Sequence, residues 1–159
     1  LVLRDDLKEF FNDLLKHLDL KKILLIDFLE NEKSASDLIK YKNDAEDDIL
    51  KIIEYESELI DAINVEDFYI SESKDRITRK FNFNFDRIFE KGCYASETEI
   101  INFRDEIIYQ KGIIEEIINL KKQNNLSMDK KRDYLNNQIS ELERMRKFKV
   151  IFPKDLQSS

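Results

Sequence analysis

Residues 48–63 read DILKIIEYESELIDAI, and this stretch decides the class of fold. Extended backwards, it forms a seam of positions in alternating steps of four and three residues, the spacing of a helix that packs side by side with another helix. The seam consists of Leu38, Lys42, Ala45, Ile49, Ile52, Glu56, Leu59 and Ile63. Polar Lys42 and Glu56 interrupt it, so we expect an ordinary bundle and not a long two-stranded coiled coil. A helix over 37–63 would span about 40 Å.

The chain as a whole contains few residues that end helices or form turns. Its 159 residues include two glycines, Gly92 and Gly112, and one proline, Pro153. Strands, hairpins and phosphate-binding loops need more turn-forming residues than this. The sequence therefore predicts an all-α fold, an elongated antiparallel helical bundle with coiled-coil-like packing. We expect a single helical domain over 1–159. Its parts are long N-terminal helices (1–63), a Phe-rich irregular middle (64–95), C-terminal helices (96–147) and a tail (148–159).

Several local signals predict where helices begin and end. Ser34, Ser36 or Asp37 could end or restart a helix, which leaves open whether the N-terminal helices are continuous. Ser96 and Glu99 have the spacing of a capping box, the clearest helix start in the chain. Gly112 lies inside the following helix, either as a tolerated cost of about 1 kcal/mol or as a point of close helix contact.

The stretch FNFNF at 81–85 has two interpretations. Its phenylalanines alternate as in a strand, yet Ile77, Phe81, Phe85 and Ile88 also fit helical spacing. Because the neighbouring sequence has no second strand candidate, we favour a helix or an aromatic loop that plugs the bundle.

The residues that most enzymes and metal sites require are scarce. One histidine, His17, and one cysteine, Cys93, cannot form a di-iron or Cys/His zinc site. We expect His17 at the surface or at its boundary and see no sign of an activated thiolate at Cys93. No nucleotide-binding glycine loop is present. The sequence therefore predicts a non-enzymatic protein without metal or cofactor.

Charge and hydropathy limit the partners. Residues 1–70 carry a net charge of −10 and residues 121–159 a net charge of +5, so nucleic acid would be repelled by the N-terminal half. The longest apolar run, 23–26, is too short to span a membrane. The single cysteine favours a reducing compartment, hence a cytoplasmic location. A removed signal peptide before Leu1 and the oligomeric state stay open.

The candidate binding surface lies near the C-terminus. Leu135, Ile139, Leu142 and Met145 form a narrow apolar stripe with basic residues beside it, and an apolar tail follows. Within this tail we include Phe148, Ile151 and Phe152 among the partner-binding residues. The alternative is that this segment is the last core helix, with the tail folded over the end of the bundle.

Parts of the chain resemble FlgN-type flagellar export chaperones, which guard hook–filament junction proteins before secretion. The resemblance rests on LKEFFNDLLKHL (7–18), LLIDFLENEKSASDL (24–38) and DILKIIEYESELIDAI (48–63), with a weaker similarity in EEIINLKKQNNLSM (115–128). It covers about two thirds of the chain, and the Phe-rich segment 81–89 departs from the pattern. The resemblance implies a cytoplasmic, non-enzymatic chaperone of long antiparallel helices. Its C-terminal amphipathic helix, here carrying Leu135, Ile139, Leu142 and Met145, would cover the terminal helix of a secretion substrate.

Two other classes fit the same sequence. One is a structural or adaptor helical bundle within a larger assembly. The other is the mature domain of a surface-anchored helical bundle protein.

Overall fold

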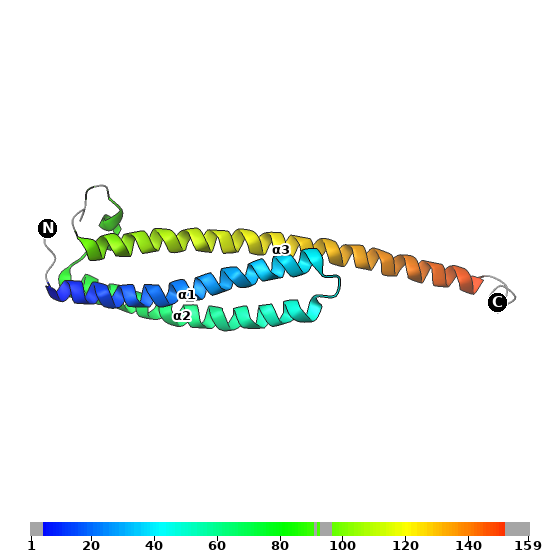
Figure 1. Ribbon diagram of the computed structural model, residues 1–159, viewed down its shortest axis with the longest axis horizontal. Coiled ribbons are helices and arrows are strands. Elements are labelled where there is room, and N and C mark those ends of the chain that lie inside the picture. The colour runs from blue at the N-terminus through cyan, green and yellow to red at the C-terminus, as the bar shows by residue number, and fades with distance from the viewer. Residues whose placement is uncertain (1–4, 91, 93–96, 152–159) are drawn as a thin grey trace. The chain divides into compact units, whose positions relative to one another are not determined.

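The computed structural model describes residues 5–90, 92 and 97–151, with side chains described as far as Met145 in the last helix. Its elements are α1 (Asp5–Tyr41), α2 (Glu46–Phe81), the 3-10 helix η1 (Phe85–Phe89) and α3 (Thr98–Ile151) (Figure 1). Three long helices pack against one another, and this part of the chain contains no strand. The predicted all-α helical bundle is confirmed.

The chain divides into two compact units. Unit 1 is Leu1–Lys121 and contains α1, α2, η1 and the beginning of α3. Unit 2 is Lys122–Ser159 and contains the remainder of α3. Each unit is described by itself below.

In unit 1 the helices run up, down and up. A short turn reverses the chain between α1 and α2, which are therefore antiparallel neighbours (Figure 1). The Phe11 and Phe103 rings lie 6.0 Å apart, and further along both helices Lys121 Nζ lies 5.3 Å from the Phe28 ring. Contacts that advance together along both helices make α1 and α3 parallel.

The first turn lies later than Ser34, Ser36 or Asp37, where the sequence suggested a break. Ser34 lies inside α1, and its hydroxyl donates to the Glu30 carbonyl oxygen at 3.1 Å, within the preceding helical turn. The chain turns at 42–45, where Asn43 and Asp44 favour a turn and three acids at 46–48 favour a helix start. Residues 37–63 therefore do not form one helix, because the seam crosses the corner between α1 and α2.

The irregular middle is shorter than the predicted 64–95. α2 continues to Phe81, and Asn82 ends it in the left-handed conformation with φ of 50°. Phe83 then turns inward, where its ring lies 5.2 Å from Phe11, and Ile88 of η1 is fully buried. The phenylalanine segment thus forms an aromatic plug, one of the two alternatives that the sequence favoured.

The core of unit 1 consists of two apolar clusters. The aromatic cluster contains Leu7, Phe11, Leu14, Leu18, Ile70, Ile77, Phe83, Ile88, Ile100 and Phe103. The aliphatic cluster contains Leu25, Phe28, Leu29, Leu59, Ile113 and Ile117. A polar layer occupies the intervening turns: Lys21 Nζ lies 2.6 Å from Asp67, and Gln110 donates to the Leu18 carbonyl oxygen at 2.8 Å. The hydrogen bond of the buried Gln110 favours one register of α1 and α3 over slipped alternatives.

Two local predictions concern the start and the middle of α3. Ser96 lies outside the described residues, so the capping box stays a prediction. A Cβ added at Gly112 would meet nothing within 4 Å, so this glycine is not a point of close helix contact. None of the helices in the described part combines the length and apolar content needed to cross a bilayer.

Candidate functional site

The predicted binding stripe lies on the helix of unit 2. Leu135, Ile139, Leu142 and Met145, which we call the stripe, follow one another in steps of four, three and three residues and share one helix face. Their exposed fractions are 43%, 53%, 61% and 59%. The side chains of Phe148 and Ile151 are not described, and Phe152 lies outside the described residues. The predicted site is therefore placed only as far as Met145.

The exposure of the stripe has an energetic consequence. Burying one Leu, Ile or Met side chain contributes about 1.5–3 kcal/mol, so four uncovered side chains leave a large unused stabilisation. The described part of unit 2 is a single helix, so it has no second element to cover them. A partner that supplied an apolar face would gain part of this free energy.

The charges of unit 2 differ in sign from those of unit 1. Unit 2 carries 9 bases and 5 acids, net +4, whereas unit 1 carries 18 bases and 29 acids, net −11. Arg132 and Arg144 are exposed near the two ends of the stripe. The excess of bases lies outside residues 135–145, where Glu141 and Glu143 accompany Arg144, so the stripe itself is mainly an apolar surface.

His17 is partly buried, between the core and the surface of unit 1, as the sequence predicted. Its Nδ1 lies 2.8 Å from Glu66 Oε2, and its ring stacks on Tyr69 with centroids 5.0 Å apart. Cys93 lies outside the described residues, so the structure does not test a Cys–His pair. Within the described ranges, no group of three His, Cys, Asp or Glu side chains could hold a metal ion.

A cluster of charged groups joins all three helices of unit 1. Lys121 Nζ lies 3.1 Å from Glu56 Oε2 and 3.7 Å from Glu32 Oε1. Both carboxylates are buried, whereas Lys121 keeps part of its side chain in solvent. Burial and the hydrogen bond from Glu32 raise the pKa of Glu56 to about 7, although Lys121 opposes the shift. The sequence marked Glu56 as an interruption of the seam but could not identify its partners, because Lys121 comes 65 residues later.

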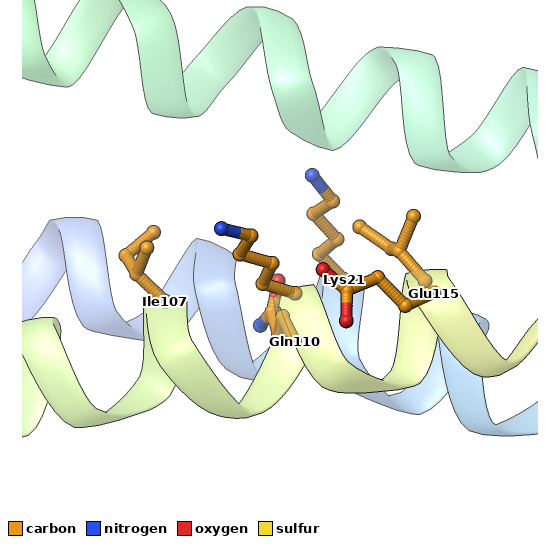
Figure 2. A pocket seen from close by; sticks show the side chains of 6 residues that line it. Lys21, Ile107, Gln110 and Glu115 are labelled. Atoms are coloured by element: carbon orange, nitrogen blue, oxygen red, sulfur yellow. The ribbon is translucent and has the colours of Figure 1, made fainter.

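A groove in unit 1 was not predicted. Lys21 of α1 and a row of α3 residues enclose a pocket of about 450 Å³ beneath the α2 ribbon (Figure 2). Its α3 residues are Ile107, Gln110, Lys111, Ile114 and Glu115. We call this the α2–α3 groove. The sequence assigned Ile107 and Ile114 to one helix face. Spacing alone does not say that α2 leaves this face of α3 partly open.

The stripe and the α2–α3 groove present methyl and methylene groups, and the carboxylates of Glu32 and Glu56 are buried between helices. Comparison with protein-family models, with curated proteins and with solved structures finds no match to this chain.

Proposed function

We propose that this chain is a non-enzymatic interaction protein that binds an amphipathic helix of a partner protein along the stripe of unit 2. Within that class, we propose a cytoplasmic export chaperone that shields a helix of a flagellar secretion substrate. The observation that carries the binding role is the exposure of Leu135, Ile139, Leu142 and Met145 on one face of a single helix.

The mechanism follows from the physics of an uncovered apolar stripe. A partner helix laid along the stripe would bury its own apolar residues at i, i+3, i+4 and i+7 together with those of this chain. While bound, the partner could not aggregate through that face. The net charge of +4 on unit 2 would speed the association of a partner with net negative charge.

The flagellar assignment depends on the sequence resemblance alone. Segments 7–18, 24–38 and 48–63 carry it, and all three lie in unit 1. The binding role has a separate basis, since it comes from the exposed stripe in unit 2. The two parts of the proposal can therefore fail independently.

A structural or adaptor bundle is the alternative that a specific observation favours. Unit 1 also exposes large apolar side chains, among them Ile23, Phe68 and Leu50. An adaptor would bind its partners through such faces of unit 1. In that case a charge placed on the stripe would leave the partners bound.

The test compares three baits in extracts of the native organism: the wild-type chain, Ile139→Asp and Asn137→Asp. Both substitutions introduce one carboxylate at an exposed position of the same helix, but residue 137 lies on the face opposite the stripe. We expect one partner to bind the wild-type chain and Asn137→Asp and to be lost with Ile139→Asp. A peptide of the partner's amphipathic helix should then bind in a one-to-one complex by calorimetry.

The outcomes separate the hypotheses. A partner that stays bound to Ile139→Asp would overturn the stripe as its binding site and favour the adaptor. A partner that needs the stripe but has no role in secretion would leave the binding role intact and refute the flagellar assignment.

A further inference from the structure

The exposed side of α2 carries a second apolar row beside the predicted seam. Of the seam positions on this helix, Ile49, Glu56 and Leu59 are buried. The residue after each seam position is exposed, and these residues follow one another in the same steps of three and four. We call this set, extended by one step to Phe68, the outer row: Leu50, Ile53, Ser57, Ile60, Asn64 and Phe68. A further helix can therefore pack along α2 with the spacing already used in the core.

The outer row has the length and the continuity of a helix-binding surface. Its four apolar side chains are 55%, 50%, 44% and 61% exposed, in the order Leu50, Ile53, Ile60 and Phe68. They lie within about 27 Å of one helix, or about five turns. Exposed apolar residues are ordinary when they are scattered singly, whereas a row along one helix is the kind of surface that binds an amphipathic helix.

Acidic side chains border the outer row on the side turned away from the seam. This border contains five exposed carboxylates: Asp47, Glu54, Glu58, Asp61 and Glu72. Lys51 is the only base among residues 46–72. None of the five carboxylates forms an ion pair with another residue in the part of the chain that the structure describes. The exposed Glu30 of α1, by contrast, lies 3.4 Å from Lys33. The negative charge of the border is therefore local to α2 and uncompensated.

Charge decides between the possible occupants of the outer row. Two copies of the chain paired through this row would bring two acidic borders together. The phosphates of nucleic acids and of anionic lipids would meet the same repulsion. A helix with lysine or arginine beside its apolar face would place cations against Glu54, Glu58 and Asp61, which follow one another in steps of four and three. Such a helix matches both the apolar row and its acidic border.

We propose that the outer row of α2 binds an amphipathic helix of a partner protein whose apolar face is edged by lysine or arginine. The surface belongs to unit 1, so it is distinct from the stripe of unit 2 and does not depend on the proposed export role. It also gives the adaptor alternative a defined surface and a defined partner chemistry.

Two synthetic peptides of about 21 residues, long enough to cover the row, serve as probes. Both place leucine at positions i, i+3, i+4 and i+7, and one has lysine at the flanking positions where the other has glutamate. Fluorescence anisotropy measures their binding to the full chain carrying Ile139→Asp, which disables the stripe. We expect the basic peptide to bind at least about tenfold more tightly than the acidic one, and added salt to weaken its binding. Failure of this experiment leaves the stripe proposal untouched.

Two substitutions of different kinds locate the binding site. Glu58→Lys combined with Asp61→Lys reverses part of the border and should raise the dissociation constant of the basic peptide about tenfold or more. Ile53→Asn removes an apolar contact from the row and should raise it about fivefold or more. Thermal unfolding checks that each variant folds, and Leu50→Asn replaces Ile53→Asn if that variant does not.

Each substitution has a matched control elsewhere in unit 1. Glu9→Lys combined with Asp13→Lys changes the net charge by the same amount at exposed positions of α1. Ile108→Asn removes an isoleucine of α3 that is 57% exposed, close to the 50% of Ile53. We expect both controls to bind the basic peptide within about twofold of the parent chain.

Four results would overturn the proposal. The basic peptide fails to bind at chain concentrations up to about 100 μM, or the acidic peptide binds equally well. The controls weaken binding as much as the substitutions in the outer row and its border. The chain dimerises in sedimentation and becomes monomeric with Ile53→Asn, because a second copy would then cover the row.

Discussion

The aromatic end of unit 1 and the helix of unit 2 use apolar side chains at the same spacing, yet their surroundings differ. Phe11 of α1 has no exposed surface and contacts the rings of Phe83, Phe85 and Phe103. Ile139 of α3 is half exposed, although it also belongs to an apolar row on an amphipathic helix. The difference arises from neighbours: three elements surround Phe11, whereas unit 2 consists of one described helix.

This comparison shows which property makes one apolar row a core and leaves another exposed. In unit 1 the apolar rows are covered by helices of the same chain, so their burial stabilises the fold. In unit 2 the same kind of row is not covered by another described element, so its burial by a partner would stabilise a complex. Substitutions in the apolar rows of unit 1 should therefore mainly lower the stability of the fold. Substitutions in the stripe of unit 2 should mainly weaken the binding of a partner.

The largest expected effect comes from removing the centre of the aromatic end. Phe11→Ala should lower the free energy of unfolding by about 3–5 kcal/mol, because it deletes a fully buried ring and leaves a cavity among three others. Chemical denaturation followed by circular dichroism measures this. Phe89→Ala in the exposed part of η1 is the control and should change stability by no more than about 0.5 kcal/mol. Equal effects of the two substitutions would contradict the aromatic cluster as the core.

A smaller effect on the free energy of unfolding should come from the buried carboxylates of unit 1, which contrast with the solvated charges of unit 2. The pKa of Glu56 is raised from 4.5 to about 7 in the folded chain, first by burial and then by Glu32. Below about pH 4.5 the carboxyl is protonated in both folded and unfolded chains. Between about pH 4.5 and 7 only the folded chain holds the proton, so this group makes the free energy of unfolding fall as pH rises.

Glu56→Gln removes that titration. Relative to wild type, the variant should gain on the order of 1 kcal/mol in stability between pH 5 and pH 8, a figure reduced for the solvent access of Lys121. Urea unfolding at both pH values measures the difference. Glu54→Gln on the exposed side of α2 serves as the control and should follow the wild-type curve. A Glu56→Gln curve parallel to wild type would refute the raised pKa.

The sequence was sufficient for the class of fold because helical spacing is local. Ile49, Glu56 and Leu59 belong to the predicted seam and are buried in α2. The position of the first corner was missed because Leu38 and Ala45 keep the three-and-four register across it, so the pattern continues where the helix does not. The partners of Glu56 were also missed, since one of them comes from a helix 65 residues away.

For the candidate site, the sequence predicted which residues share a face but not whether that face is covered. Leu14 and Leu142 stand in similar local patterns, and only the arrangement of other helices makes the first buried and the second exposed. The α2–α3 groove was missed for the same reason, because Ile114 looks like an ordinary core residue until the distance of the neighbouring helix is known. Coverage is a tertiary property, and periodicity does not contain it.

The smallest expected effect concerns the stripe itself. Leu142→Ala removes an exposed side chain from a helix that no other described element of unit 2 covers, and alanine has the higher helix propensity. The free energy of unfolding should change by no more than about 0.5 kcal/mol. Chemical denaturation under the conditions used for Phe11→Ala gives the value. A loss of about 2 kcal/mol or more would mean that Leu142 is buried within the monomer, because large-to-small changes reach that size only in packed cores. The stripe would then be core in the same sense as the aromatic end, and it would no longer be available to a partner.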